Sequence, residues 1–372
     1  MIKKNFFMFL HLLILIFSII ACEKKTDNLQ ETTILKNETP TIKTEIQEIT
    51  KPVDEIMEET GQMFGFIPLK DSILSACNLL SDGFFDKVFR EKGASFYKRY
   101  TRQKQNDVFA PGVAFPFVRR LLAINKRFPG HEPIEVVLLS KNDPDTGLRV
   151  FNSIAHYGLN IVRAGFLNGR SPIEYIPAFN TSLFLSASAE DVKEAVNAGF
   201  PAGTVLGQCN TDDEDDDELR IAFDFDGVIV DDQAERIFQE KDLDAFHDNE
   251  IMNANNPMDP GPLFKLFKQL SALQRADRLS ARKHPDTYKR FLRISIVTAR
   301  SAPAHERAIK TLRKYRMEVD EAFFLGGIEK GRILDIMKPH LYFDDQLVHL
   351  KSSTGKHIPS VHIPFGITNA GK

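Results

Sequence analysis

Short apolar runs alternate with helical patterns along most of the chain. In the second half, the runs that predict strands are Arg220–Val230, Leu292–Val297, Glu321–Leu325, His340–Phe343 and Ser360–Ile363. The helical patterns between them lie at about Gln233–Lys241, Pro262–Gln274, Pro303–Tyr315 and Gly331–Met337. Buried strands that alternate with helices are typical of parallel strands joined by crossover helices. We therefore expect an α/β fold with a doubly wound parallel sheet, in which ligands bind at the carboxyl ends of the strands.

The two halves of the body show the same pattern. When Ser140 is aligned with Thr298, the apolar run Val136–Leu139 falls on Ile294–Val297, and the register continues without a gap. Because the strand patterns agree although identity is low, we interpret the halves as two copies of one unit. The expected organisation is a first copy at residues 53–210, an acidic linker at 211–218 and a second copy at 219–372.

The amino-terminal residues have the pattern of an export signal. Lys3 and Lys4 precede an apolar run from Phe6 to Ile20, which ends at Ala21-Cys22. The run is short for a membrane-spanning helix, and its end resembles a bacterial lipobox. We expect a lipoprotein-type signal at residues 1–22, lipidation of Cys22 and a flexible tether at 23–52. The alternative is an uncleaved anchor; both predict an exported protein held at a membrane, on its periplasmic or cell-surface side.

Charge and metal-binding residue types exclude some classes of partner. The 48 Lys and Arg residues oppose 51 Asp and Glu, a net charge of −3, so no basic excess is available to bind nucleic acid. The acidic linker is expected to repel itself and to be a solvated loop rather than a metal site. The histidines lack the helical spacing of zinc ligands. Besides Cys22, only Cys77 and Cys209 remain, either as a pair or as buried thiols.

Polar residues that suit phosphate chemistry follow four predicted strands. Asp224 and Asp226 come directly after an apolar run, and Gly227 allows a tight turn there. Buried carboxylates so close together need compensation, for which a hard divalent cation is suited. The other polar residues are Thr298 at the end of the second strand, Lys330 at a helix start, and Asp344-Asp345 after a later strand. Because carboxyl ends of parallel strands share one edge of a sheet, we expect these groups to lie together.

The order Asp-x-Asp, Thr, Lys, Asp-Asp resembles the four-motif signature of the haloacid dehalogenase superfamily. Further stretches resemble the cytosolic type I 5′-nucleotidases within it. They are Ser140–Ile154, Val297–Arg300, Asp320–Gly327 and Phe343–Gln346. This resemblance runs from about residue 65 to the end of the chain. It does not include the export signal, so the alternative location is the cytoplasm, as in the family.

The resemblance implies a role for each motif residue. Asp224 is the expected nucleophile, and Asp226 is expected to protonate the leaving 5′-oxygen and then to activate water. Magnesium is expected to be bound by the Asp224 carboxylate, the backbone carbonyl of Asp226 and Asp345, with Asp344 beside them. Thr298 and Lys330 are expected to hold the phosphate oxygens. Arg300 is expected either to touch phosphate or to pair with a surface carboxylate at a helix start.

The first copy lacks these chemical groups. Ser75 and Cys77 stand where Asp224 and Asp226 stand in the second copy, Pro172 replaces Lys330, and Ser186-Ala187 replaces Asp344-Asp345. We therefore interpret it as a degenerate domain. Its stretch with Ser140, Asn142, Asp145 and Arg149 is expected either to form part of the nucleoside pocket or only to pack as a helix start.

The segment at about 233–289, between the first two motifs, is long enough for a small helical cap over the site. Its expected apolar face, which can equally be core, consists of Phe238, Phe246, Leu263, Phe264 and Phe267.

The resemblance implies a Mg²⁺-dependent 5′-nucleotidase that hydrolyses nucleoside 5′-monophosphates through an aspartyl-phosphate. One alternative is a phosphomonoesterase of broad specificity. The other, from a different class, is a surface lipoprotein that binds a ligand without turnover.

Overall fold

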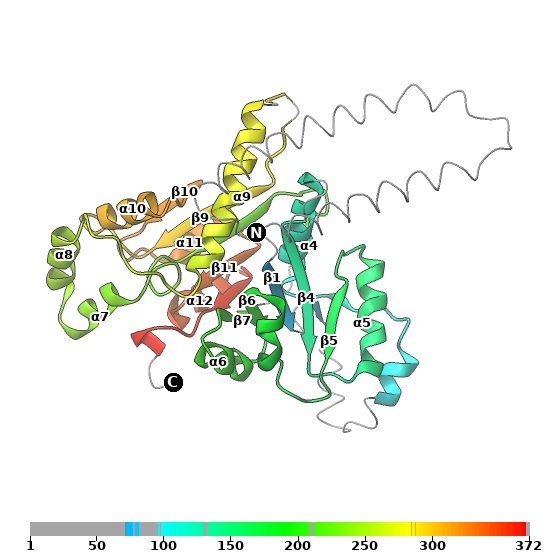
Figure 1. Ribbon diagram of the computed structural model, residues 1–372. Helices are drawn as coiled ribbons and strands as arrows, with labels where there is room; N and C mark the ends of the chain where they lie inside the picture. Colours follow the sequence, from blue (N-terminus) through cyan, green and yellow to red (C-terminus); the bar gives the residue numbers. More distant parts are fainter. Residues whose placement is uncertain are drawn as a thin grey trace, which may run out of the picture. The chain divides into compact units, whose positions relative to one another are not determined.

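A single ten-stranded sheet runs through the computed structural model, which describes residues 71–76, 79–81, 96, 98–128, 132–207, 212–283, 285–286 and 288–369 (Figure 1). The first half of the chain contributes β1 (Asp71–Ala76), β4 (Ile134–Ser140), β5 (Arg163–Phe166), β6 (Thr181–Ser186) and β7 (Ala202–Leu206). The second half contributes β8 (Leu219–Phe223), β9 (Leu292–Thr298), β10 (Glu321–Phe324), β11 (Leu341–Asp344) and β12 (Ser360–His362). A separate two-stranded sheet pairs β2 (Leu80–Ser81) with β3 (Ala110–Pro111).

The two halves of the sheet have the same strand order. The whole order is β10-β9-β8-β11-β12-β7-β6-β1-β4-β5, and outward from the middle each half repeats the same sequence of strands. All pairs within a half are parallel, whereas β12 and β7 meet in antiparallel register. The fold is therefore α/β with a mostly parallel sheet, as expected. The antiparallel junction has one consequence: the carboxyl ends of the two sets of strands lie at opposite edges of the sheet.

Helices cover both faces of this sheet. In the first half they are α4 (Phe115–Ala123), α5 (Pro144–His156) and α6 (Ala189–Asn197), with the 3₁₀ segments η1 (Ile124–Arg127) and η2 (Ile173–Phe179). In the second half they are α7 (Gln233–Glu240), α8 (Leu243–Met252), α9 (Phe264–Lys283), α10 (His305–Lys314), α11 (Lys330–Met337) and α12 (Leu347–Thr354), with η3 (Ile367–Asn369). The sequence pattern did not predict α8 and α12. It also extended the first strand to Val230, whereas β8 ends at Phe223, before the turn at Gly227, which has φ +70°.

One hydrophobic core extends through both halves. Alternate residues of a strand face opposite sides, so Ile294 and Ile296 of β9 join the largest cluster while Val297 joins another. The largest cluster contains buried residues of both halves, and the rings of Phe128 and Phe291 meet across it at 6.0 Å. The two halves that the sequence predicts therefore share one hydrophobic core.

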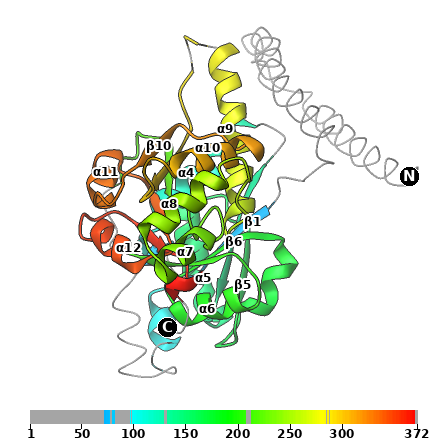
Figure 2. The same cartoon turned by 90° about the vertical axis from the view of Figure 1, so that its left-hand side faces the viewer.

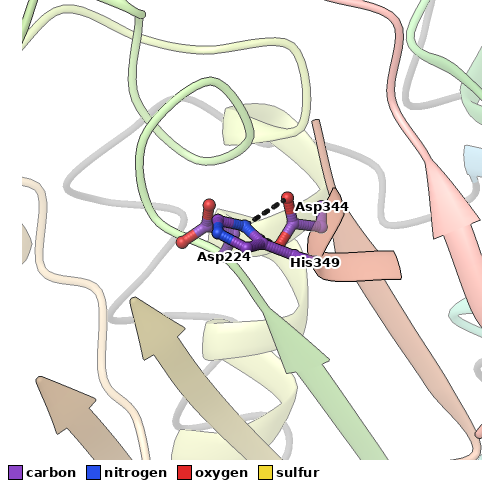
Figure 3. A group of neighbouring side chains, drawn as sticks. All are labelled: Asp224, Asp344 and His349. Atoms are coloured by element: carbon purple, nitrogen blue, oxygen red, sulfur yellow. Dashed lines mark hydrogen bonds and ion pairs between the residues drawn. The ribbon is translucent and has the colours of Figure 1, made fainter. Parts of the chain in front are cut away.

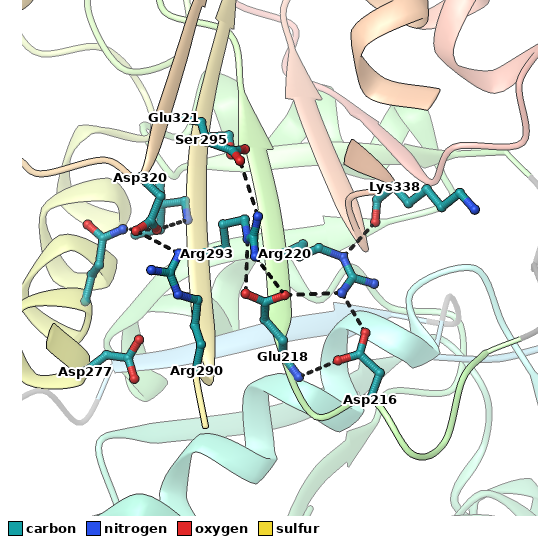
Figure 4. Close-up of polar contacts among 12 residues, drawn as sticks. Asp216, Glu218, Arg220, Asp277, Arg290, Arg293, Ser295, Asp320, Glu321 and Lys338 are labelled. Carbon is teal, nitrogen blue, oxygen red and sulfur yellow. Dashed lines mark hydrogen bonds and ion pairs between the residues drawn. The ribbon is translucent and has the colours of Figure 1, made fainter. Parts of the chain in front are cut away.

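Arginines hold three carboxylates of the acidic linker, whereas Asp213, Glu214, Asp215 and Asp217 are exposed. Asp212 accepts hydrogen bonds from Arg119 Nε (3.0 Å) and Arg120 Nη1 (2.6 Å), both on α4. On the other side, Asp216 pairs with Arg220 Nη1 of β8 at 2.6 Å, and Glu218 accepts from Arg293 Nε of β9 at 3.0 Å (Figure 4). The expectation of a solvated, self-repelling loop is thus wrong for Asp212, Asp216 and Glu218, because guanidinium groups from both halves compensate the carboxylates.

Only part of the predicted cap stands apart from the sheet. Helix α9 packs against β9, and Phe267 of α9 is buried against the ring of Phe223 at 5.1 Å. Leu263, Phe264 and Phe267 therefore belong to the core and not to a cap. The remainder of the insert is α7 and α8, and α8 lies beside α10 (Figures 1 and 2).

Several expectations concern residues outside the described ranges. These are the export signal at 1–22 with Cys22, the tether at 23–52, and the two other cysteines, Cys77 and Cys209. Within the described ranges, no helix combines the length and the apolar composition needed to cross a bilayer.

The buried His340 gives a test of this fold. Burial, helped by Arg120 and Arg220, lowers the pKa of His340 to about 3 from its ordinary 6.5, and its Nδ1 accepts a hydrogen bond from the Arg220 backbone at 3.0 Å. Because the folded pKa is the lower one, the unfolded chain binds the extra proton between these values. The free energy of unfolding should then fall as the pH falls through this window, by about 1.4 kcal/mol per pH unit.

We predict that His340→Asn, which keeps an acceptor near the Nδ1 position, removes this part of the pH dependence. Urea unfolding of the wild type and the variant at pH 7 and pH 5 measures it. The loss of stability between the two pH values should be smaller in the variant by about 2 kcal/mol. Equal losses would mean that His340 is not held neutral by the fold.

Candidate active site

The motif residues of the second half meet at one edge of the sheet. Strands β9, β8 and β11 are neighbours, and Thr298, Asp224 and Asp344 stand at or directly after their carboxyl ends. Lys330 is the first residue of α11. All four residues are at most 4% exposed. The sequence therefore predicted both the edge and the residues that occupy it.

Lys330 lies between two buried carboxylates. Its Nζ is 2.9 Å from Asp224 Oδ2 and 2.8 Å from Asp344 Oδ2. Burial by itself would lower the pKa of Lys330, but the two carboxylates outweigh burial and hold it well above the ordinary value. The ammonium therefore stays charged at neutral pH beside Asp224 Oδ2. The other oxygen, Asp224 Oδ1, accepts a hydrogen bond from the Phe225 backbone at 2.7 Å.

Asp344 makes several hydrogen bonds besides its ion pair. It accepts from the Tyr342 hydroxyl, from the Gln346 backbone at 2.8 Å, and lies 3.2 Å from His349 Nδ1. Burial would raise the pKa of Asp344, but Lys330 and His349 hold it well below its usual range. Figure 3 shows His349 of α12 turned toward Asp344 and Asp224. Sequence analysis missed the role of His349, although its place one helical turn after Asp344-Asp345 was a usable signal.

Asp345 is the carboxylate with capacity left for a cation. Its Oδ2 accepts from the Thr368 hydroxyl at 2.8 Å, while its buried Oδ1 has no hydrogen-bond partner among the described residues. Burial, with Asp224 and Asp344 nearby, raises the pKa of Asp345 to about 9; burial likewise raises the pKa of Asp224 to about 7. Both shifts report uncompensated negative charge, and a hard cation with oxygen ligands would compensate it. The residues present therefore fit Mg²⁺.

A second set of donors is less suited to that cation. Donor atoms of Asp224, Asp344 and His349 lie within 4.8 Å of one another. However, Lys330 already pairs with Asp224 and Asp344, so a cation placed there would face its ammonium. The side of Asp224 that faces Asp345 is the better position.

Arg300 does not pair with a surface carboxylate, which was one of its two expected contacts. Its guanidinium pairs with the Asp226 carboxylate through Nε and Nη2, each at 2.6 Å, and its Nη1 pairs with Glu250. Arg300 is 4% exposed and Glu250 is 1% exposed, so this is no surface contact. Arg300 is therefore committed to two carboxylates, one of them on the helical insert.

The structure does not bring the first-half residues to this site. Ser140 ends β4, and five strands and the antiparallel junction separate β4 from β8. Asn142, Asp145 and Arg149 follow it at that distant edge, where Asp145 pairs with Arg102 and Arg149 Nε donates to the Asp107 carbonyl at 2.6 Å. Within one chain, the expectation that this stretch lines the same pocket is therefore wrong, because the two sets of strands run in opposite directions.

A cavity of about 240 Å³ lies away from these groups. Because Asp217 and Phe291 precede β8 and β9, it lies by their amino ends, at the edge opposite to Asp224. Its lining residues are Ala123, Ile124, Lys126, Arg127, Asp217 and Phe291.

Acidic groups and a lysine at the carboxyl ends of a mostly parallel α/β sheet are consistent with a haloacid dehalogenase-like fold. This is the class of protein that the fold and the site define. Comparison with known proteins gives the family within it. The 5′-nucleotidase family matches residues 77–370, which include every strand of the ten-stranded sheet except β1, and the chain belongs to that family.

Individual relatives differ in what they add. Cytosolic 5′-nucleotidase 1B of Homo sapiens is 34% identical over 289 residues, which cover 75% of this chain and 46% of that protein. The chain thus spans less than half the length of this relative. Among solved structures, histidinol dehydrogenase from Elizabethkingia anophelis covers 89% of this chain and 66% of its own at 9% identity, but its TM-score of 0.19 carries no argument.

Gly227 provides a test of the cation site. Its φ is +70°, and a Cβ there would lie 2.8 Å from the carboxyl carbon of Asp345. We predict that Gly227→Ala displaces Asp345 and abolishes stabilisation by Mg²⁺. In the wild type, Mg²⁺ at about 100 times its Kd should stabilise the fold by about 2.7 kcal/mol, read as a rise in Tm.

Gly199→Ala is the matched control. Gly199 has φ +83°, and a Cβ added there would have no atom within 4 Å, so this variant carries the backbone cost without a collision. It should lose stability but keep the full Mg²⁺ response. A normal response in Gly227→Ala would contradict the assignment of Asp345 as a ligand.

Proposed function

We propose that this chain hydrolyses nucleoside 5′-monophosphates to nucleosides and phosphate. The observation that carries the proposal is the buried Lys330 between Asp224 and Asp344, at the sheet edge of a 5′-nucleotidase family member. The relative from Homo sapiens bears the name of that activity. A buried ammonium beside a carboxylate lets a phosphate dianion approach an anionic nucleophile.

In this proposal, Asp224 attacks phosphorus through a carboxylate oxygen and forms an aspartyl-phosphate, while the bond to the 5′-oxygen breaks. Asp226 gives a proton to the departing oxygen and later takes one from the water that hydrolyses the intermediate. Lys330 and Thr298 hold the non-bridging oxygens. Asp224, Asp345 and the backbone carbonyl of Asp226 would hold Mg²⁺, with Asp344 orienting Lys330. Bound there, the cation would neutralise charge on the phosphoryl group.

The test is phosphate release by the protein with Mg²⁺ present. We expect AMP, IMP, GMP, CMP and UMP to be turned over well above glucose 6-phosphate and p-nitrophenyl phosphate. Chelation by EDTA should stop release, and Asp224→Asn should reduce it to the background. Equal rates for all esters would support the proposed hydrolysis mechanism, but the protein would then be a phosphomonoesterase of broad specificity and not a 5′-nucleotidase. No release from any ester by folded, Mg²⁺-loaded protein would sink the proposal in favour of a binding protein.

We infer further that the first half is a copy that has lost catalysis. The identical strand order supports it, as do the seven-residue strands β4 and β9, which end at the aligned Ser140 and Thr298. At the position of Lys330 stands Pro172, and Ser186 ends β6 where Asp344 ends β11. In this proposal the first half contributes strands to the sheet but lacks the groups that attack or bind phosphate.

We predict that Asn142→Ala and Asp145→Ala leave the KM for AMP within about twofold of the wild type, because both lie at the edge opposite to Asp224. Initial rates over a range of AMP concentrations measure it. A rise in KM of about tenfold, worth about 1.4 kcal/mol, would mean that this stretch reaches a nucleotide, and then from another copy of the chain.

The location of the chain is a separate proposal. We propose that residues 1–22 direct export and that Cys22 carries the lipid that holds the body at a membrane. The support is the basic start, the short apolar run and the Ala21-Cys22 end. In that setting the enzyme would act on nucleotides outside the cytoplasm; the alternative is the cytoplasmic setting of the related family.

A further inference from the structure

A chain of buried ion pairs joins Asp226 to the helical insert. Arg300 follows β9 and holds both oxygens of the Asp226 carboxylate, at 2.6 Å each. Its remaining nitrogen, Nη1, pairs with Glu250 of α8 and also donates to the Ala304 carbonyl at 3.2 Å. Each nitrogen of this guanidinium therefore has a protein acceptor.

Glu250 connects this pair to a second arginine. Its other carboxylate oxygen lies 2.8 Å from Arg307 Nη1 of α10, whose Nε donates to the Asn256 carbonyl at 3.0 Å. The side chain of Glu250 is fully buried, and those of Arg300 and Arg307 are nearly so. A buried carboxylate needs such partners, because removing an unpaired charge from water costs a large amount of free energy. Glu250 thus fixes both where α8 docks and how Arg300 is oriented.

Aromatic rings limit the movement of the Arg300 guanidinium. Its central carbon lies 5.6 Å from the ring centre of Phe225 and 5.6 Å from that of Phe246. Phe225 separates Asp224 from Asp226 in sequence, and Phe246 belongs to α8 together with Glu250. Asp242 caps this helix by accepting from the Ala245 backbone at 2.8 Å. The insert therefore presents one charge and one ring to Arg300, both from the same helix.

We propose that Arg300 and Glu250 are positioning residues for Asp226, and that docking of α8 through Glu250 sets the orientation in which Asp226 serves the leaving group. This rests on the proposed nucleotidase reaction. Neither residue touches substrate in it. Arg300 acts by holding the Asp226 carboxylate, and Glu250 acts by holding Arg300.

The chemistry of the first step makes the inference testable. As the Asp224–phosphorus bond forms, the bond from phosphorus to the 5′-oxygen breaks, and its electron pair stays on that oxygen. An alkoxide is a poor leaving group, with a conjugate acid near the pKa of about 15.7 of water, so the proton from Asp226 must arrive as the bond breaks. A thiolate, with a pKa of about 8.5, leaves without a proton. Only the oxygen ester should depend on the placement of Asp226.

The experiment compares AMP with adenosine 5′-S-phosphorothiolate, in which sulfur replaces the bridging 5′-oxygen. Both carry the same nucleoside, so any change in binding affects them equally. The quantity measured is kcat/KM, which reports the steps up to release of the nucleoside. For Arg300→Lys and Glu250→Gln, we expect kcat/KM for AMP to fall about 100-fold and that for the sulfur analogue to fall less than about threefold.

Two further variants separate positioning from damage. Glu250→Asp keeps the charge but shortens the side chain, so it should show the same selective loss even if Glu250→Gln folds poorly. Arg293→Lys is the matched control: Arg293 lies on the same strand β9, but pairs with Glu218 and Glu321 near its amino end. Arg293→Lys should leave kcat/KM unchanged for both substrates. The Tm of each variant is measured alongside.

The outcomes are distinct. Equal falls for the two substrates would show a structural role only, and an unchanged kcat/KM for AMP would show that Arg300 and Glu250 do not position Asp226. Either result overturns the inference while leaving the proposed function in place. Failure of the proposed function is seen separately, in a wild type that releases no phosphate from AMP, or one whose activity survives Asp224→Asn.

Discussion

The arrangement of the site depends on one interaction, the double ion pair of the Lys330 ammonium with Asp224 and Asp344. Asp224 and Asp344 are brought together by neighbouring strands β8 and β11 and are almost fully buried. Two such carboxylates repel each other and resist burial, as the raised pKa of Asp224 shows. Lys330 lies within 2.9 Å of both, so its charge makes their burial tolerable. Even so, Asp345 keeps an oxygen without a partner among the described residues, and this leaves charge for a cation. Lys330 thus compensates Asp224 and Asp344, whereas a cation would compensate Asp345 and share Asp224 with the lysine.

Much of this was predictable from local sequence. Asp224, Thr298 and Asp344-Asp345 could be placed at one edge because each ends or follows an apolar run, and parallel strands align their carboxyl ends. Lys330 could be added because it starts the helix that comes after another such strand. The direction in which β7 meets β12 was not predictable in this way, since it depends on how two similar halves pair across the chain. That one junction decides whether Ser140 lies at the same edge of the sheet as Asp224 or at the opposite edge. The contacts of Arg300 were equally hard to predict. Its partner Glu250 lies in α8, a helix whose pattern was not detected, and a pair between buried side chains far apart in sequence leaves no periodic signal.

The linker shows the same limit. A run of carboxylates read alone predicts repulsion and exposure. In the folded chain, Arg119 and Arg120 of α4 and Arg220 and Arg293 of the second half meet Asp212, Asp216 and Glu218. Arg220 follows the acidic run closely, but Arg119, Arg120 and Arg293 lie far from it in sequence, so composition could not reveal that the run is a contact between the halves. Charge patterns predict exposure only where no opposite charge is folded against them.

The half without catalytic carboxylates still supports the site through the sheet. Strand β7 pairs with β12, and Thr204 is opposite His362 in that register. His362 Nε2 lies 3.1 Å from the carbonyl oxygen of Asp345, and the amide of Asn369 donates to the same oxygen at 2.9 Å. A side chain at Gly203 of β7 would collide with Val361 and Ile363, so glycine at this position lets β7 pack closely against β12. The position of Asp345 therefore depends on β12, and β12 depends on a strand of the first half for one of its two neighbours. A first half that shares a core and a sheet with the second cannot be removed without disturbing Asp345 at the other end of these contacts.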